Sequence, residues 1–447
     1  MTGLPSSIVC AGCGWSPPPE EPYPFRCANA ARDDDTDHVL TVVLDHARLL
    51  FPRGTESNPF LRFRTLLHSY HLARAGGLGD AEYVALVERL DRAVAQVDGG
   101  GFTVTPLGRQ QALSDRLGFA APGGIWVKDE TGNVSGSHKG RHLMGLLIHL
   151  EVVERLRLVR GDGAAPDLAI ASCGNAALAA AVVARAAERP LRVFIPTTAD
   201  PVVVARLERL GALLTVAPRA DGVPGDPTFH RLREAVRDGA LPFTCQGNYN
   251  GLTIEGGKTL GYEMIGQMAE EGDRMDRLFI QVGGGALASA VTQAFADGVR
   301  LGALAALPRM HPVQTEGAFP LKRAYDRLIA RAGASGSPQD TLRYAATHRS
   351  EFMWPWESEP RSVAGGILDD ETYDWMAVAH GMLDAGGSPI VVSEETLIEA
   401  NRLARELTGI PADPTGSAGL AGLIQLRRAG GLDAHERMAV LFTGVQR

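Results

Sequence analysis

Cysteine is scarce in this sequence. Five cysteines in 447 residues are an odd and sparse set, which argues against a disulfide framework and for a reducing compartment. Long apolar runs are absent as well: none reaches the roughly 18 residues of a membrane span, and the first residues lack the charged and apolar regions of a secretory signal. We therefore expect a cytoplasmic protein without a membrane partner.

Positive charge is also limited. The 44 lysines and arginines are fewer than the 52 aspartates and glutamates, and no long basic run occurs. A protein that binds a polyanion concentrates basic residues on one surface. The balance therefore argues against nucleic acid as a partner and favours a small-molecule substrate.

Apolar residues and glycine, in contrast, are abundant. Hydrophobic residues make up 45% of the chain, and 447 residues exceed the length at which one core normally keeps growing. Two domains, or one two-lobed unit, are therefore expected. The 52 glycines imply many tight approaches between backbone segments.

Cys10 and Cys13 have the C-x-x-C spacing of a zinc-ribbon knuckle, and Cys27 offers a third ligand. Ala30 stands where a second C-x-x-C would end, so a closed tetrahedral site needs a distant residue such as His38. We therefore expect a degenerate segment without metal.

Residues 1–35 are expected to be an arm, because the run SPPPEEPYP cannot form a long helix or strand. Residues 58–98 carry apolar residues at helical spacing, broken by a Gly-Gly pair that suits a turn. From Gly124, short apolar runs alternate with helical patterns; the runs are IWVKDE, DLAIAS, LRVFIP, ALLTVAP, RLFIQV, HPVQTEG and MAVLFTG. This alternation predicts parallel β/α layering, with chemistry at the carboxyl ends of the strands.

Residues 323–360, containing RLIARAGASGSPQD and EFMWPWESEP, are expected to be an irregular surface loop or lid.

Lys139 lies in the run SGSHKGRHLMG, at a predicted junction of strand and helix. A helix N-terminus and a partly desolvated pocket there would lower the pKa of its amine, as Schiff-base chemistry requires. On this run alone, a solvated lysine in the first turn of a helix is the alternative.

Three further runs give the lysine possible partners. In QVGGGALASA, Gly283, Gly284, Gly285 and Ala286 expose backbone N–H groups to an anion at a helix N-terminus, although a tight turn with nothing bound is the alternative. In ASCGNAALAAA, the Asn175 amide can bond a ligand hydroxyl, or simply cap the helix. In LFTGVQR, the Thr443 hydroxyl can meet a ring nitrogen, or simply end a strand. One ligand carries all four groups that these motifs would bind: pyridoxal 5′-phosphate (PLP) has an aldehyde, a phosphate, a phenolic oxygen and a ring nitrogen.

Two competing motifs are weaker. GLTIEGGKTLG, around Lys258, is one residue too long for a nucleotide-binding P-loop and is expected to start a packing helix. Cys173 has no evident His or Asn partner for nucleophilic catalysis and is expected to be a small packing residue.

The order of these motifs resembles the tryptophan-synthase-β family of PLP enzymes, called fold type II, and within it threonine synthase and its relatives. TPLGRQQALSDRLG, IWVKDETGNVSGSHKGR, NYNGLTIEGGKTLGYEM, HPVQTEGAFPL and ILDDETYDW carry the resemblance across nearly the whole chain. It implies an α/β fold of two domains, each an open, mostly parallel sheet flanked by helices, with the active site in the cleft between them. The implied large PLP-binding domain is 36–142 plus 249–447, and the small α/β domain is 143–248.

The resemblance also implies the roles of single residues. Lys139 would hold the cofactor and move protons at Cα and Cβ, and Asn175 would contact the ring oxygen. The four residues 283–286 would bind the phosphate, and Thr443 would meet the ring nitrogen without protonating it. The implied substrate-binding residues are Ser172, Cys173, Gly174 and Arg141.

His138 departs from the threonine-synthase pattern, and so do Gly140, Arg141 and His142. The Ser-His-Lys order is similar to the tryptophan-synthase β subunit, where that histidine lies beside the cofactor phosphate. The implied activity is a lyase or synthase acting on a small L-amino acid by Cα deprotonation and β- or γ-elimination or replacement, with a homodimer as the expected assembly. An ammonia-lyase or dehydratase, a β-replacement synthase on a serine-type substrate, and a decayed binding protein are the alternatives. For a phosphate-bearing substrate, Arg141, Lys258 and His138 are candidate cations.

Overall fold

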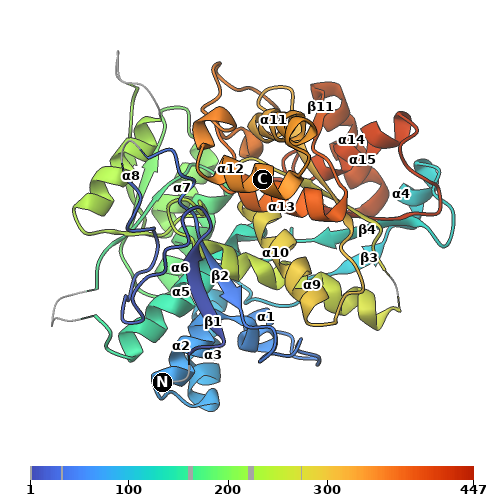
Figure 1. Ribbon diagram of the computed structural model, residues 1–447. Helices are drawn as coiled ribbons and strands as arrows, with labels where there is room; N and C mark the ends of the chain where they lie inside the picture. The colour runs from blue at the N-terminus through green and yellow to red at the C-terminus, as the bar shows by residue number, and fades with distance from the viewer. Residues whose placement is uncertain (1–2, 32–33, 160–164, 220–225, 273) are drawn as a thin grey trace.

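The computed structural model, drawn in Figure 1, describes residues 3–31, 34–159, 165–219, 226–272 and 274–447. Its larger sheet has six strands. They are, in spatial order, β11 (Ile390–Val392), β10 (Arg309–Thr315), β9 (Arg277–Gln281), β12 (Arg437–Phe442), β4 (Gly124–Asp129) and β3 (Leu107–Arg109). All neighbours are parallel except β3 and β4. The continuous apolar runs of β9 and β12 fit strands that are covered on both faces.

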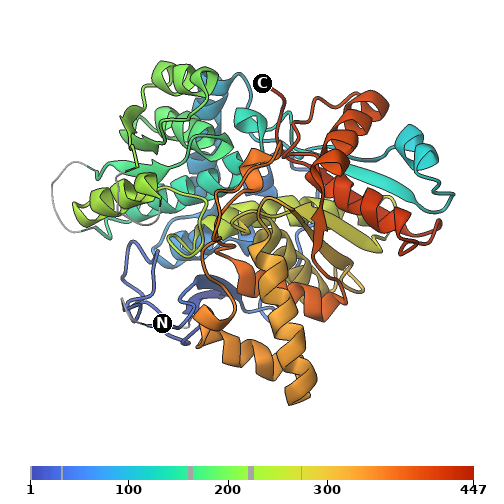
Figure 2. The same cartoon turned by 90° about the horizontal axis from the view of Figure 1, so that it is seen from above.

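The smaller sheet has four parallel strands. In spatial order they are β7 (Leu213–Val216), β6 (Leu191–Ile195), β5 (Leu168–Ala171) and β8 (Leu241–Pro242). Figure 2 shows this part of the chain, in green, on one side of the molecule and the C-terminal helices, in red, on the other. The protein is thus an α/β protein of two domains, each built on an open, mostly parallel sheet.

Helices flank both sheets. Their bounds are α1 (Pro59–Arg62), α2 (His68–Ala75), α3 (Asp80–Asp98), α4 (Gln111–Arg116), α5 (Lys139–Arg155), α6 (Asn175–Ala186), α7 (Pro201–Arg209), α8 (Pro227–Arg237), α9 (Thr253–Glu270), α10 (Ala286–Arg300), α11 (Pro320–Ser335), α12 (Pro338–Ala346), α13 (Trp375–Ala385), α14 (Glu394–Thr408) and α15 (Ala418–Arg428). Short 3₁₀ turns are η1 (Arg64–Leu66), η2 (Val134–Gly136), η3 (Arg349–Glu351) and η4 (Gly365–Ile367). None of the helices in the described ranges is long and apolar enough to cross a membrane.

Helix α9 contains the run that resembles a P-loop, and it is a packing helix, as predicted. It is buried along most of its length and packs against α5, which is buried in the same way. The two helices approach so closely that a Cβ on Gly256 would lie 2.1 Å from the Arg141 carbonyl oxygen. Lys258 is buried and pairs with Asp297 at 3.2 Å.

The predictions for residues 58–98 and 323–360 had different outcomes. Residues 58–98 form α1, η1, α2 and α3, and the predicted turn contains Gly77 at φ +94°. The prediction of an irregular segment over RLIARAGASGSPQD was wrong, because this run belongs to α11 and α12. Its Gly-Ser-Pro sequence separates two helices: Gly336 ends α11 at φ +82°, and the Ser337 hydroxyl caps α12. Residues 352–360 have no helix or strand.

The N-terminal arm is joined to the rest of the chain by a strand pair. β1 (Ser6–Cys10) runs antiparallel to β2 (Leu40–Leu44), and the Ser6 hydroxyl bonds the rings of His68 and His71 in α2. The arm is therefore packed against the N-terminal helices.

Candidate active site

The four motifs singled out in the sequence follow four strands of the two sheets. The lysine loop follows β4, the run 172–175 follows β5, the glycines follow β9, and Thr443 follows β12. Direct contacts join them: Ser137 and Gly444 form an antiparallel bridge, and a Cβ on Gly444 would lie 2.8 Å from Asn175 Nδ2. Loops from both sheets therefore meet at the carboxyl ends of their strands, where α/β proteins bind ligands.

Lys139 is the first residue of α5, and its side chain is half-buried. The preceding turn has a left-handed backbone at Ser135 (φ +61°) and Gly136 (φ +72°). Position 136 requires glycine because a Cβ would lie 2.5 Å from a methyl group of Val445. Within the described residues, the Lys139 amine has no hydrogen-bond or ion-pair partner, so its nitrogen is free to react.

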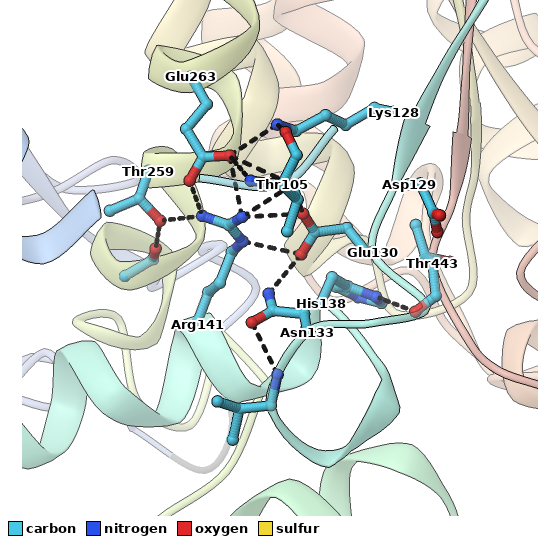
Figure 3. A network of polar contacts seen from close by, with 12 residues as sticks. Thr105, Lys128, Asp129, Glu130, Asn133, His138, Arg141, Thr259, Glu263 and Thr443 are labelled. Atoms are coloured by element: carbon cyan, nitrogen blue, oxygen red, sulfur yellow. Dashed lines mark hydrogen bonds and ion pairs between the residues drawn. The ribbon is translucent and has the colours of Figure 1, made fainter. Parts of the chain in front are cut away.

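His138 precedes the lysine and is almost fully buried. Its Nδ1 bonds the Thr443 carbonyl oxygen at 3.2 Å (Figure 3), while its buried Nε2 has no partner in the described chain. Burial, reinforced by the Lys139 charge, holds the pKa of His138 well below its usual value. A neutral ring with a free nitrogen is suited to a hydrogen bond with a ligand rather than to an ion pair.

Thr443 ends β12 and is buried beside Gln281, the last residue of β9. The Gln281 amide donates to the Thr443 hydroxyl oxygen and, at 2.8 Å, to the Gly416 carbonyl oxygen. Because the Thr443 oxygen already accepts this bond, its own O–H is left to donate. Such a donor matches an unprotonated ring nitrogen.

Asn175 is the first residue of α6, and the cap before it is Gly174, so the simple capping role does not apply. The Asn175 amide oxygen accepts a hydrogen bond from the Arg447 guanidinium group. The Asn175 amide N–H donates a hydrogen bond to the Asp413 carboxylate. Ser172, Cys173 and Gly174 are partly exposed, and a Cβ on Gly174 would face open space. This loop therefore has room for a ligand.

The glycine run lies against residues 367–374, part of the run ILDDETYDW, for which the sequence predicted no role in the site. A Cβ on Gly283 would lie 2.3 Å from Asp369 Oδ2, and one on Gly284 would lie 2.8 Å from the Tyr373 ring. The Gly284 N–H donates to Asp369 Oδ2 at 2.7 Å. The Gly284 N–H is therefore occupied by a carboxyl oxygen, and Gly283 and Gly284 are also required by the packing of residues 367–374.

Two buried carboxylates in the segment 367–374 lie near Lys139. Burial raises the pKa of Asp374 to about 7 and that of Asp369 in the same direction, while the Lys139 charge lowers both. Asp374 Oδ1 is buried without a partner in the described structure. The surroundings of the lysine are therefore acidic, a property carried by the run ILDDETYDW but not predicted from it.

Arg141 was predicted to bind substrate, and the structure contradicts this. Its side chain is fully buried, and it bonds Glu130 at 2.8 Å and Glu263 at 2.5 Å (Figure 3). Lys128 pairs with Glu263 at 2.6 Å, so two cations and two carboxylates balance. The Arg141 N–H groups also bond Thr105 and Thr259, which leaves none for a ligand. The network holds the start of α5, and hence Lys139, against β4 and α9.

The residues present fit PLP. Lys139 offers a free amine, Thr443 a hydroxyl donor, His138 an unpartnered ring nitrogen, and Gly284 a backbone N–H that bonds a carboxyl oxygen. The fit requires Asp369 to share or leave the Gly284 N–H when a phosphate is bound. Gln281, Asp369 and Asp374 were missed in the sequence because each acts through a contact across the sheets.

Known proteins resemble this chain over most of its length. The threonine synthase of Methanosarcina acetivorans is 23% identical over 377 residues, covering 79% of this chain and 76% of the relative. Among solved structures, the diaminopropionate ammonia lyase of Escherichia coli (TM-score 0.58, 18% identity, 88% of this chain and 92% of that chain) and maize serine racemase (TM-score 0.58, 16% identity, 81% and 93%) share its fold. The profile of the family described as pyridoxal-phosphate dependent enzyme matches residues 100–444. The chain therefore belongs to the family of pyridoxal-phosphate dependent enzymes, and within it is threonine synthase-like.

Proposed function

We propose that this protein removes the Cα proton of a small L-amino acid and then eliminates or replaces a β or γ substituent. The observation that carries the proposal is the free Lys139 amine at the meeting point of the loops, with the Thr443 hydroxyl directed as a donor by Gln281. When bound, PLP withdraws electrons from the substrate Cα and makes its proton acidic.

Side chains of this protein would move the protons, contact the ring nitrogen and bind the substrate carboxylate. Lys139 takes the proton from Cα and returns a proton to the leaving side of the substrate. Thr443 holds the ring nitrogen uncharged, which favours elimination over transamination. The partly exposed loop 172–174 offers the Ser172 hydroxyl to the substrate carboxylate.

The charges around Lys139 favour a substrate without a phosphate ester. Of the three cations considered for a phosphate, Arg141 and Lys258 are buried in ion pairs and His138 is held neutral. Asp369 and Asp374, in contrast, lie near the lysine. We therefore place hydroxy- and diamino-acid substrates ahead of a phosphorylated one, because none of these three side chains is available as a cation for a substrate phosphate.

The experiment is a substrate screen with the PLP-loaded protein. L-serine, L-threonine, L-2,3-diaminopropionate and O-phosphohomoserine are each followed by absorbance, ammonia release and phosphate release. We expect ammonia release from an unphosphorylated substrate. Phosphate release as the fastest reaction would reverse the proposed order of substrates, and a protein that stays colourless with PLP would end the enzyme interpretation.

Lys139→Ala tests the central residue. We expect turnover to fall by at least about 10³-fold, because the proton acceptor and the covalent anchor are both lost. Lys322→Ala, on the surface of α11, is the matched control and is expected to retain activity. Steady turnover by Lys139→Ala, at a rate like that of the control, would disprove the mechanism.

A homodimer and a cytoplasmic location rest on the family resemblance and on the few cysteines of the sequence. Sedimentation equilibrium of the PLP-loaded protein tests the assembly: a single species of one chain mass would exclude the dimer. Fractionation of source cells tests the location, which recovery outside the cytoplasmic fraction would exclude.

A further inference from the structure

The N-terminal arm and the residues just after it carry four side chains suited to metal binding that the proposed reaction does not use. The ligand atoms of Cys10, Cys13, Cys27 and His38 all lie within 4.8 Å of one another. Cys13 Sγ lies 3.6 Å from Cys27 Sγ, and Cys10 Sγ lies 3.4 Å from His38 Nδ1. A tetrahedron with Zn–S bonds of about 2.3 Å and a Zn–N bond of about 2.1 Å has edges of roughly 3.5–3.8 Å. These two distances are close to such edges.

Backbone N–H groups face the sulfur atoms of the three cysteines. The N–H two residues after each cysteine donates to its sulfur, from Gly12 to Cys10, from Trp15 to Cys13 and from Asn29 to Cys27. Gly14, at φ +75°, allows the turn after the first pair. Donors that point at sulfur favour the deprotonated form, which is the form that binds metal.

His38 is oriented for metal binding by a carboxylate. Its Nε2 bonds Asp34 Oδ2 at 2.5 Å, and its Nδ1 faces Cys10. A carboxylate behind the second nitrogen is the usual arrangement of a metal-binding histidine, because it fixes the tautomer and the ring orientation.

The pairing of β1 with β2 places His38 beside the cysteines. The Ala11 N–H donates to the Val39 carbonyl oxygen at 2.9 Å, and a Cβ on Gly12 would lie 2.5 Å from the Asp37 carbonyl oxygen. The first pair of cysteines and the histidine are thus brought together by a strand pair, which the spacing of cysteines alone does not reveal.

We propose that Cys10, Cys13, Cys27 and His38 bind one zinc ion in a closed, structural site. Four protein ligands leave no open position for water or substrate, so the ion would stabilise the arm and take no part in the reaction. Binding releases the remaining thiol protons to solvent. The expectation of an arm without metal, drawn from the missing second C-x-x-C, is replaced by this proposal, which does not depend on the identity of the substrate.

Metal analysis of the full-length, PLP-loaded protein tests the site. After expression with added zinc and exhaustive dialysis, we expect about one zinc per chain by mass spectrometry. Cys13→Ser, at an exposed position, is expected to lower this to about a tenth or less. Cys245→Ser, at a buried cysteine outside the arm, is the matched control and should keep its zinc. A wild-type protein with no zinc above the dialysis buffer, zinc retained by Cys13→Ser, or a Cys13–Cys27 disulfide in place of metal would overturn the proposal.

Ligand identity is tested separately, in case a cysteine variant fails to fold. Co²⁺ in the wild-type protein should give the intense visible bands of a tetrahedral thiolate site, at longer wavelength than the cofactor absorbance. His38→Cys should retain zinc as a Cys₄ site, whereas His38→Ala should lose most of it. An octahedral cobalt spectrum, or equal zinc in the two His38 variants, would contradict the assignment.

Discussion

A hydroxyl group at Thr443 illustrates how a single residue controls the chemistry at this site. Its oxygen accepts a bond from Gln281, and this fixes the direction in which its hydrogen points. We expect Thr443→Val, which has a similar shape, to lower kcat by about tenfold, the effect of one lost hydrogen bond in a buried site. Thr347→Val, at an exposed threonine, is the control. Steady-state kinetics with the best substrate measure both, and equal kcat values would exclude the ring contact.

Asp374 gives the site a pH dependence. Its pKa is raised from 3.8 to about 7 by burial, so its protonated form is favoured in the folded state. Its contribution to stability is therefore fully present below pH 3.8 and is lost as pH rises through 7. Asp374→Asn is neutral at every pH and should avoid this loss.

We expect the free energy of unfolding of Asp374→Asn, relative to wild type, to rise by on the order of 2 kcal/mol between pH 5 and pH 8. Urea unfolding at four pH values in this range measures the difference. Asp238→Asn, at an exposed carboxylate after α8, serves as a control and should show little change. A difference between Asp374→Asn and wild type that does not vary with pH would refute the assignment.

At the scale of secondary structure, the contact between α5 and α9 holds the start of the lysine helix. Gly256 has no room for a side chain, because a Cβ would lie 2.1 Å from the Arg141 carbonyl oxygen. Gly256→Ala must push the helices apart, and we expect a loss of about 1–3 kcal/mol of stability together with weaker PLP binding.

Gly266→Ala in the same helix is a matched control. There the nearest atom is the flexible end of Arg62, 3.3 Å away, so alanine should stabilise the helix by about 0.5–1 kcal/mol. Thermal unfolding and PLP titration of both variants provide the comparison. Equal effects of the two substitutions would show that the close contact is unimportant.

Seven strands from Gly124 onwards were predictable because each is a short apolar run between turn residues, whereas β1, β2, β3, β8 and β11 were not predicted. IWVKDE, LRVFIP and MAVLFTG became β4, β6 and β12 with shifts of one or two residues. The sequence pattern did not predict helices α11 and α12, because the small residues of this run are typical of a loop, although they lie at the end of one helix and the start of the next. Local pattern therefore predicted these strands well and the glycine-rich helix junction poorly.

The site was only partly predictable for a related reason. Lys139, the glycine run and Thr443 follow strands and could be found along the chain, whereas Arg141 was assigned to the substrate because Glu263 is 122 residues away in sequence. Asp369 and Gln281 likewise acquire their roles from residues that only the fold brings near. Sequence order does not contain these long-range partners.

For the whole molecule, Arg349 links the end of the arm, at Asp35 and the following Asp37, to the active-site segment 367–374. It bonds Asp37 at 3.1 Å and also pairs with Glu371, which lies between Asp369 and Asp374. The Asp35 side chain adds bonds to Ser350. The arm and the segment against the glycine run are thus connected through one arginine.

We expect Arg349→Met to raise the Kd for PLP by about fivefold, because the segment 367–374 loses a tether, and to lower the Tm. Arg343→Met removes an exposed ion pair on the neighbouring helix α12 and should change neither value. Fluorescence titration with PLP and calorimetry measure the two effects. If Arg349→Met binds PLP as tightly as Arg343→Met, the arm and the site are independent.

The position of β12 in the larger sheet affects how the protein folds during synthesis. It is the last strand in sequence, yet it lies between β9 and β4, with Val440 opposite both Phe279 and Val127. Until it arrives, β4 and β9 each have an unpaired edge, and Thr443 is not in place. The larger sheet therefore closes late and through distant pairings, which slow folding. During synthesis on the ribosome, the edges of β4 and β9 therefore remain unpaired until β12 has been made. In this interval the nascent chain can bind chaperones or aggregate instead of folding.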